Sequence, residues 1–526
     1  MIEDLFQRDV TRDINPVVYF HEQDPAKVAA EVSEYIITGG YPEEDDRAIE
    51  HGIHEQFVRL LGAMGKDLKK GGTGLPAVWI SGFYGSGKSS FAKLLGMSLN
   101  NLALPDGTKL ADALLKRDES PNRAQFIEAW QNLVQDIKPM AVVFDIGSVA
   151  RDDEHIHAAV VRECQKAMGY CGTSDLVADH EIRLEADGLY DDFLAKVKEL
   201  HGKSWSDLRN KKLAEDLFSA TLHALQPKLY GDEMAWMDAR AGRKLGRSAS
   251  ETVSDIEHML AARYPGRTLF LVIDEVSQYV HDNEDRMLAL QSFVSALGQR
   301  LKGKVWLLAT GQQKLEEGEA ATTTLGKLKD RFPAHLRVHL SSANIRDVVH
   351  QRLLKKKVGV VPDLESLYQR HRSDIELYAY QGNQMSVQDF TEVYPMLPGH
   401  IDLLMAITTG LRARSTRVQG DSQAIRGLLQ LLGDLFRDQK LISHEVGTLL
   451  TLDRIYDVLH TALEADVQST LMRAFAFCDK HKADGLPDPV LALRVVKAVS
   501  LLELVQDERI KTDVQLIAQC LYERLG

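Results

Sequence analysis

Cysteine is scarce in this chain, and no stretch of it is apolar enough to cross a membrane. The four cysteines form no C-x-x-C pair, so the sequence supports neither a disulfide framework nor a cysteine-rich zinc site. No apolar run approaches the roughly 18 residues that a membrane-spanning helix needs. The acidic first residues, MIED, are unlike a secretory signal peptide. These absences predict a soluble, cytoplasmic protein with no membrane partner.

An excess of positive charge is also lacking. The chain has 63 basic and 76 acidic residues, a formal net charge of −13, which argues against a protein coated in nucleic acid. A local basic face is still compatible with this balance, and two basic clusters are candidates for contact with DNA phosphates. The alternative is that each is the solvated face of a helix. The clusters are Arg412, Arg414 and Arg417, and Arg352 with Lys355, Lys356 and Lys357.

The most informative motif is a glycine-rich loop at residues 82–89. Its sequence, GFYGSGKS, matches G-x-x-x-x-G-K-[S/T] at every fixed position. The loop follows the apolar run 77–80, which we expect to be a buried strand, and precedes a predicted helix over 88–99, whose N-terminus would face phosphates. We expect Lys88 to bind the β- and γ-phosphate oxygens of a nucleoside triphosphate, and the Ser89 hydroxyl to coordinate Mg²⁺. The predicted nucleotide-binding residues here are Gly82, Phe83, Tyr84, Gly85, Ser86, Gly87, Lys88, Ser89 and Ser90.

A second apolar run, at residues 269–273, ends in two carboxylates. In P-loop enzymes an acid at such a strand end holds the Mg²⁺ shell, and an adjacent glutamate polarises the attacking water. We assign these roles to Asp274 and Glu275. The following apolar run, 305–309, ends in TGQQ, where Thr310, or failing it Gln312, is predicted to lie between the two catalytic strands and orient the water. The alternative is that these polar residues only open a turn.

Two arginines are candidates for stabilising charge in the transition state. Arg331 shortly precedes the last predicted core strand, from which it could reach the γ-phosphate held by a neighbouring subunit. The alternative is a solvated arginine or a partner for Asp330. Arg426 could reach the nucleotide from a helical lid. His155 and His157 are two residues apart and could suggest a metal site, but the start of a helix is the favoured explanation.

Apolar runs alternate with helical patterns, which predicts an α/β fold with a parallel sheet covered by helices on both faces. The runs lie at 77–80, 141–144, 269–273, 305–309 and 338–340. The gap between 145 and 267 is too long for a simple crossover and has helical periodicity, so we place a helical insertion at 172–262. The expected segments are an N-terminal region (1–60), the nucleotide-binding core (61–342), an all-α lid (343–440) and a helical or winged-helix-like region (441–526).

The ordered set of motifs resembles an AAA+ ATPase of the origin-recognition and Cdc6-like branch. Within that branch the chain is most similar to the P-loop ATPase of bacteriophage exclusion (BREX) systems, the BrxC type. The resemblance covers the first residues to about residue 355. It is carried by DLF (4–6), RDINPVV (12–18), EYIIT (34–38), WISGFYGSGKS (79–89), IDEVSQY (273–279), TGQQ (310–313), RF (331–332) and LSSAN (340–344).

The resemblance implies an AAA+ P-loop core and ATP as the nucleotide, with Mg²⁺. It also implies a homo-oligomer that acts with a methyltransferase, an alkaline-phosphatase-like protein and small accessory proteins, on DNA that it contacts directly or through them. The leading interpretation is an ATPase that assembles or remodels a DNA-associated phage-defence complex. One alternative is a nucleotide-gated scaffold with slow or incidental hydrolysis. Another is an origin-type DNA loader, which would need a basic winged-helix tail.

Overall fold

The computed structural model divides the chain into two compact units, Tyr19–Ser341 and Met1–Val18 with Ser342–Gly526. We describe each unit by itself. The structure describes residues 1–12, 18–45, 48–49, 51–82, 87–240, 246–281, 283–311, 315, 324–340, 343–377, 385–414, 428–438, 440–481, 488–505 and 511–526.

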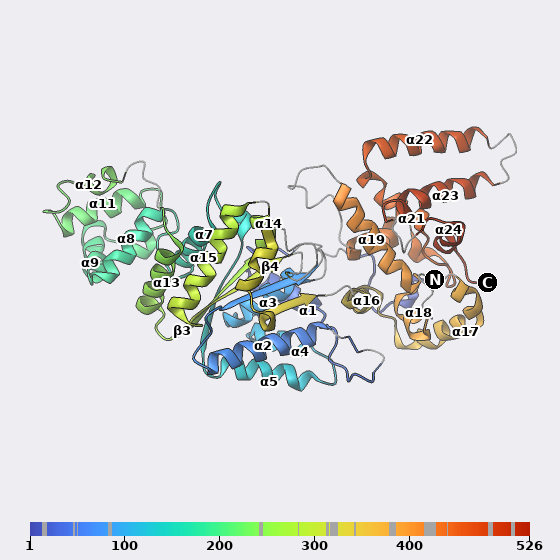
Figure 1. Cartoon of the computed structure of the whole chain (residues 1–526), viewed down its shortest axis with the longest axis horizontal. Coiled ribbons are helices and arrows are strands. Elements are labelled where there is room, and N and C mark those ends of the chain that lie inside the picture. Colours follow the sequence, from blue (N-terminus) through green and yellow to red (C-terminus); the bar gives the residue numbers. More distant parts are fainter. Residues whose placement is uncertain are drawn as a thin grey trace. The chain divides into compact units, whose positions relative to one another are not determined.

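The first unit contains a five-stranded parallel sheet in the order β2-β3-β4-β1-β5 (Figure 1). Each predicted apolar run lies within one of its strands, so the prediction of an α/β fold with a parallel sheet is confirmed. The strands are β1 (Ala77–Gly82), β2 (Lys138–Asp145), β3 (Arg267–Asp274), β4 (Val305–Gly311) and β5 (Arg337–Leu340).

Helices precede, connect and cover these strands. Those outside the long β2–β3 connection are α1 (Pro25–Glu34), α2 (Ile53–Lys69), α3 (Lys88–Leu99), α4 (Leu110–Lys116), α5 (Arg123–Val134), α14 (Val276–Val280), α15 (Glu284–Leu301) and the 3₁₀ segments η3 (Thr324–Arg331) and η4 (Ala334–Leu336). The connection itself contains α6 (Ile146–Val149), α7 (Ile156–Ala167), α8 (Asp175–Ala186), α9 (Tyr190–His201), α10 (Trp205–Leu208), α11 (Ala214–Leu225), α12 (Ala235–Asp238) and α13 (Ala249–Arg263).

Both faces of the sheet are buried because successive side chains of a strand point to opposite sides. Val142, Leu271 and Leu307 share one register row and join the core formed with α7, α13 and α15. The adjacent row, which includes Val143 and Val272, faces α3. The strands therefore read as continuous apolar runs, which is typical of a parallel sheet covered on both sides.

Helix α3 lies close to the sheet because Gly96 has no side chain at the contact. A Cβ atom at this position would lie 2.8 Å from Cγ2 of Val272 and 3.0 Å from Cγ2 of Val143. On its other side, the Phe91 ring stacks on Phe57 of α2 with ring centroids 4.0 Å apart. The helix is thus fixed between the sheet and α2, which also fixes its N-terminus at the end of β1.

Replacing Gly96 with alanine should lower the free energy of unfolding, because the β-branched Val272 and Val143 cannot move aside easily. Overpacking of this kind costs about 1–3 kcal/mol, more than the roughly 1 kcal/mol that alanine gains in helix propensity. Urea denaturation measures the change. Gly62→Ala in α2 is the matched control, since its Cβ would have no atom within 4 Å and alanine there should stabilise the protein. Equal effects of the two substitutions would contradict the close packing of α3.

The connection between β2 and β3, where the sequence predicts a helical insertion, contains helices α6 to α13. The buried carboxylate of Glu181 in α8 accepts hydrogen bonds from Trp205 Nε1 of α10 (2.8 Å) and from the backbone N–H of Cys171 (2.6 Å). Burial raises the pKa of Glu181 although these hydrogen bonds lower it. Helix α13 lies within the predicted span 172–262 but packs on α7 and α15, so it covers the sheet.

In the second unit, the described secondary structure is helical apart from isolated backbone bridges. The sequence predicts a helical or winged-helix-like region at 441–526. In the described part of that region, the β-type pairing is one isolated bridge between Thr448 and Arg524. The elements are η1 (Glu3–Leu5), α16 (Ala343–Val349), the π-helical turn His350–Leu354, η6 (Val358–Val360), α17 (Val361–Leu377), α18 (Val387–Val393), α19 (Pro398–Arg414), α20 (Leu428–Asp438), η8 (Leu441–Ser443), α21 (Leu452–Leu459), η9 (His460–Ala462), α22 (Ala465–Lys480), α23 (Pro489–Leu502) and α24 (Val514–Leu521).

The first residues of the chain pack into this helical unit. The backbone N–H of Lys357 donates to the carbonyl of Leu5 (2.9 Å), and the N–H of Gln7 donates to that of Lys355 (2.8 Å). The N–H of Ile2 donates to the carbonyl of His444 at 2.9 Å. The contacts within the chain divide the expected N-terminal segment 1–60 between the two units. Its first 18 residues belong to the helical unit, and the rest belong to the sheet-containing unit. Among the helices described in the two units, none is long and apolar enough to span a bilayer.

Candidate functional site

The carboxyl ends of β1, β2, β3 and β4 lie together at one edge of the sheet, where ligands bind in parallel α/β folds. Strand β1 ends at Gly82, and α3 begins at Lys88. Gly87 has φ of +85°, a left-handed conformation that favours glycine, and its carbonyl accepts the N–H of Phe91 at 2.8 Å. Lys88 is buried, and Ser89 and Ser90 are half-buried, in the first turn of α3. Phe83, Tyr84, Gly85 and Ser86 lie outside the described residues.

Strand β3 delivers the two predicted acids to this edge. Asp274 is the last residue of the strand and is buried, and Glu275 follows it with φ of +59° as the N-cap of α14. That left-handed conformation is uncommon for a residue with a side chain. It lies at the turn of the chain from β3 into α14.

Thr310 joins the two acids. Its hydroxyl donates to Oδ1 of Asp274 and accepts the backbone N–H of Glu275 at 2.9 Å. The side chain is fully buried at the end of β4, which lies between β1 and β3 and pairs Thr310 with Ile80. Thr310 thus lies on the strand between β1, which leads into the 82–89 loop, and β3, which ends at Asp274. Gln312 lies outside the described residues.

A third carboxylate, which the sequence analysis missed, lies beside this pair. Asp145 ends β2 opposite Asp274 in the register, and its Oδ1 accepts the N–H of Gly147 at 2.9 Å. Burial raises the pKa of Asp145, the hydrogen bond from Gly147 lowers it, and the charge of Asp274 raises it, with a net increase. The signal was present in the sequence, because Asp145 ends the apolar run 141–144 just as Asp274 ends its own run.

Three acids, Asp145, Asp274 and Glu275, lie at this edge, and among the described residues Lys88 is the cation whose charge acts on Glu275. Burial raises the pKa of Glu275, the charges of Asp145 and Asp274 raise it further, and Lys88 acts in the opposite direction. The edge therefore carries an excess of negative charge that a divalent cation would neutralise. Asp274 and the Ser89 hydroxyl supply the hard oxygen ligands that Mg²⁺ prefers, and Mg²⁺ commonly needs only one or two protein carboxylates beside phosphates and water. In the described part of the chain, no group of three His, Cys, Asp or Glu side chains is arranged for a metal ion.

The raised pKa of Glu275 predicts how turnover depends on pH. If Glu275 is the general base of an ATPase, as the sequence predicts, it must be ionised, so kcat/KM for ATP should fall as the pH decreases through a value above the usual range for glutamate. Asp145→Asn removes one neighbouring charge, which should lower the pKa of Glu275 and move this acid limb to lower pH. A pH–rate profile of the two proteins measures the shift.

The stability of the same variant provides an internal control. Because the folded-state pKa of Asp145 is raised, its stabilising contribution is present below its ordinary pKa and is lost as the pH rises through the raised value. Asparagine, which keeps an oxygen for Gly147, should therefore not lower the melting temperature at pH 8. An unchanged acid limb in a stably folded Asp145→Asn protein would contradict the coupling between the two acids.

The structure describes one of the two arginines that the sequence predicts to stabilise charge. Arg331 ends η3 and is half-buried, and its Nε has no hydrogen-bond partner among the described residues. The contacts described for Arg331 do not join it to Lys88, Asp274 or Glu275. Its neighbour Phe332 packs edge-on against Trp79 of β1, with ring centroids 5.0 Å apart. Arg426 lies outside the described residues.

The two histidines lie away from the acids. His155 and His157 help to line a groove of about 660 Å³ between α13 and α15. His157 Nε2 contacts the carbonyl of Arg247 at 2.8 Å, so this nitrogen carries a proton and donates. Burial lowers the pKa of His157, which favours the neutral ring. His155 is the N-cap of α7, and His157 lies in its first turn, which agrees with the interpretation that these histidines start a helix.

One of the basic clusters is smaller than its sequence indicates. Lys356 is buried, and its ammonium donates to the carbonyls of Leu354 (2.8 Å) and Glu392 (3.1 Å). Burial lowers its pKa to about 7. Its ammonium is therefore not available to a DNA phosphate, whereas Lys355 and Lys357 are exposed. The side chains of Arg412, Arg414 and Arg417 lie outside the described ones.

Comparisons with known proteins do not identify the chain. No protein-family model matches it, and no solved structure matches it.

Proposed function

We propose that this chain is an AAA+ P-loop ATPase that binds ATP with Mg²⁺ and hydrolyses it. The single observation that carries the proposal is the bridge made by Thr310. A buried hydroxyl that bonds both Asp274 and the backbone of Glu275, one strand away from a G-x-x-x-x-G-K-S turn, supports a site for phosphoryl transfer to water.

In this proposal each residue at the edge has one task. The backbone of 82–88 and the Lys88 ammonium bind the phosphates, and Ser89 and Asp274 hold Mg²⁺, which neutralises charge on the phosphate oxygens when it is bound. Glu275 accepts a proton from water as the water oxygen bonds to the γ-phosphorus and the bond to the β-phosphate oxygen breaks. Thr310 holds Asp274 and Glu275 in register. Arg331 of a neighbouring subunit and Arg426 of the lid would stabilise the charge that develops.

The wider role is proposed from the sequence resemblance to BREX ATPases. On that basis the ATPase assembles or remodels a DNA-associated phage-defence complex together with a methyltransferase and a phosphatase-like protein. The raised pKa of Glu275 supports turnover over a passive scaffold, because a base whose pKa is closer to neutrality accepts a proton more readily.

The experiment that tests the proposal measures ATP binding by calorimetry and phosphate release at steady state, with and without duplex DNA. Binding with turnover supports the ATPase. Binding without turnover under every condition would instead identify the nucleotide-gated scaffold. A chain that binds no ATP in the presence of Mg²⁺ would overturn the proposal.

A further inference from the structure

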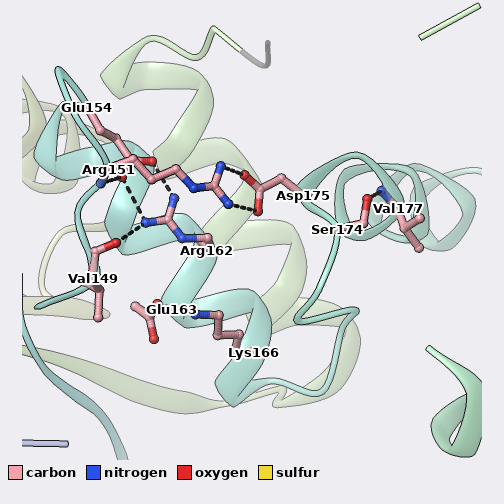
Figure 2. A network of polar contacts seen from close by, with 9 residues as sticks. All are labelled: Val149, Arg151, Glu154, Arg162, Glu163, Lys166, Ser174, Asp175 and Val177. Carbon is pink, nitrogen blue, oxygen red and sulfur yellow. Dashed lines mark hydrogen bonds and ion pairs between the residues drawn. The ribbon is translucent and has the colours of Figure 1, made fainter. Parts of the chain in front are cut away.

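A polar network connects Val149, at the end of α6, to Asp175, at the start of α8 (Figure 2). At its centre the guanidinium of Arg162 donates to both carboxylate oxygens of Glu154, with the second bond at 2.9 Å. The same guanidinium donates to the carbonyl of Val149 at 2.6 Å. The backbone N–H of Arg151 also donates to Glu154, at 2.9 Å, and the Arg151 side chain pairs with both oxygens of Asp175. Asp175 is the first residue of α8.

Two short helices connect this network to the acids. Helix α6 has Asp145 as its N-cap and ends at Val149, whose carbonyl accepts Arg162. Helix α14 begins immediately after Glu275, and the hydroxyl of its Tyr279 donates to the carbonyl of Glu154. The two helices also pack against each other. Asp145 and Glu275 are thus each connected, through one short helix, to the Glu154–Arg162 pair.

The inner and outer parts of the network differ in exposure. The Glu154 and Arg162 side chains are only 12% and 8% exposed. Burial would raise the pKa of Glu154, but the hydrogen bonds from Arg162 and Arg151 and the charge of Arg162 more than offset this, so the pKa is lowered and the pair is ionised. In contrast, Arg151 is 62% and Asp175 is 27% exposed. A buried ion pair is costly to break, whereas an exposed pair is weak and opens easily.

We propose that this network couples the nucleotide state of the site to the inserted helices α8–α12, with the Arg151–Asp175 pair as the switchable contact. The inference rests on the proposed function. In the free protein Asp145, the N-cap of α6, repels Asp274 and also Glu275, the N-cap of α14. A bound cation removes this repulsion, so α6 and α14 approach each other, the Glu154–Arg162 pair is held more firmly, and Arg151 is fixed against α8. By linkage, a partner that orders α8–α12 would raise the affinity for the nucleotide by the same factor.

Hydrogen–deuterium exchange of the whole chain, with and without MgATP, tests this coupling. MgATP should slow exchange in α8 of the wild type. In Arg151→Ala and Asp175→Asn the nucleotide-dependent change should fall by about 1.5- to 5-fold, the effect expected of one exposed ion pair. The charge-reversed double variant, Arg151→Glu with Asp175→Lys, should restore it. Lys166→Ala is the matched control, because it removes an exposed ion pair with Glu163 that lies within α7 alone (Figure 2).

A second variant tests the coupling without nucleotide. Asp145→Asn removes part of the repulsion, so in the nucleotide-free protein it should slow exchange in α8, as MgATP does in the wild type. The inference is overturned, with the ATPase proposal intact, if the wild type binds MgATP and α8 does not respond, or if Arg151→Ala responds as the wild type does. If the calorimetric measurement detects no MgATP binding, the ATPase proposal fails, and the inference fails with it.

Discussion

Replacing Glu275 with glutamine is expected to lower the steady-state rate of ATP hydrolysis by about 10²- to 10⁴-fold, the usual contribution of a general base. Glutamine has nearly the same shape but cannot accept a proton from water. The backbone N–H of residue 275 would still donate to Thr310, so the strand end should keep its geometry. The affinity for MgATP should stay close to that of the wild type, because the substitution leaves Lys88 and Ser89 in place. Phosphate release and calorimetric titration measure the two quantities separately.

The matched control for this substitution is Glu119→Gln, which makes the same change at an exposed position of the same unit. It should leave both turnover and affinity unchanged. A Glu275→Gln protein that hydrolyses ATP at the wild-type rate would remove Glu275 from the chemistry. The search for the base would then turn to Asp145, the other acid of raised pKa at the same edge.

Lys88→Ala should weaken ATP binding by about 10- to 150-fold, because hydrogen bonds to charged groups contribute about 1.5–3 kcal/mol each. Lys88 is the cation that offsets the acids around Glu275, so its loss should also raise the pKa of Glu275 further and reduce the ionised fraction of the base. Titration of the variant with ATP and Mg²⁺ measures the affinity. An affinity within twofold of the wild type would refute the role of the 82–89 loop.

The control for Lys88→Ala is the same substitution at Lys116, an exposed residue at the end of α4. It should bind ATP as the wild type does. Urea denaturation of both variants separates loss of binding from loss of folding, because Lys88 is buried and its removal can also affect stability.

Most of the sheet and the centre of the site could be predicted because their signals are local. The apolar runs within β1–β4 have no polar interruption, and the glycine loop at 82–89 has a fixed spacing. The helix predicted over 88–99 has these bounds as α3. Thr310 could be placed because a polar residue at the end of a strand between two functional strands has few other positions available.

Other features depend on contacts between residues far apart in the sequence. Asp145 ends an apolar run, but only the pairing of β2 with β3 sets it opposite Asp274. The burial of Lys356 depends on Leu354 and Glu392 and could not be read from a run of three lysines. The packing of residues 1–12 combines backbone hydrogen bonds with buried side chains such as Phe6, whose ring contacts Phe436, more than 400 residues away in the sequence.

The packing of the first residues has a practical consequence for dissecting the molecule. Because Leu5 and Gln7 bond to the backbone around Lys356, the chain leaves the helical unit and re-enters it more than 300 residues later. A fragment that begins at residue 342 would lack Leu5 and Gln7, so the backbone groups of Lys355 and Lys357 would lose these hydrogen-bond partners. The helical unit is better produced as a fusion of residues 1–18 to 342–526 through a short designed linker.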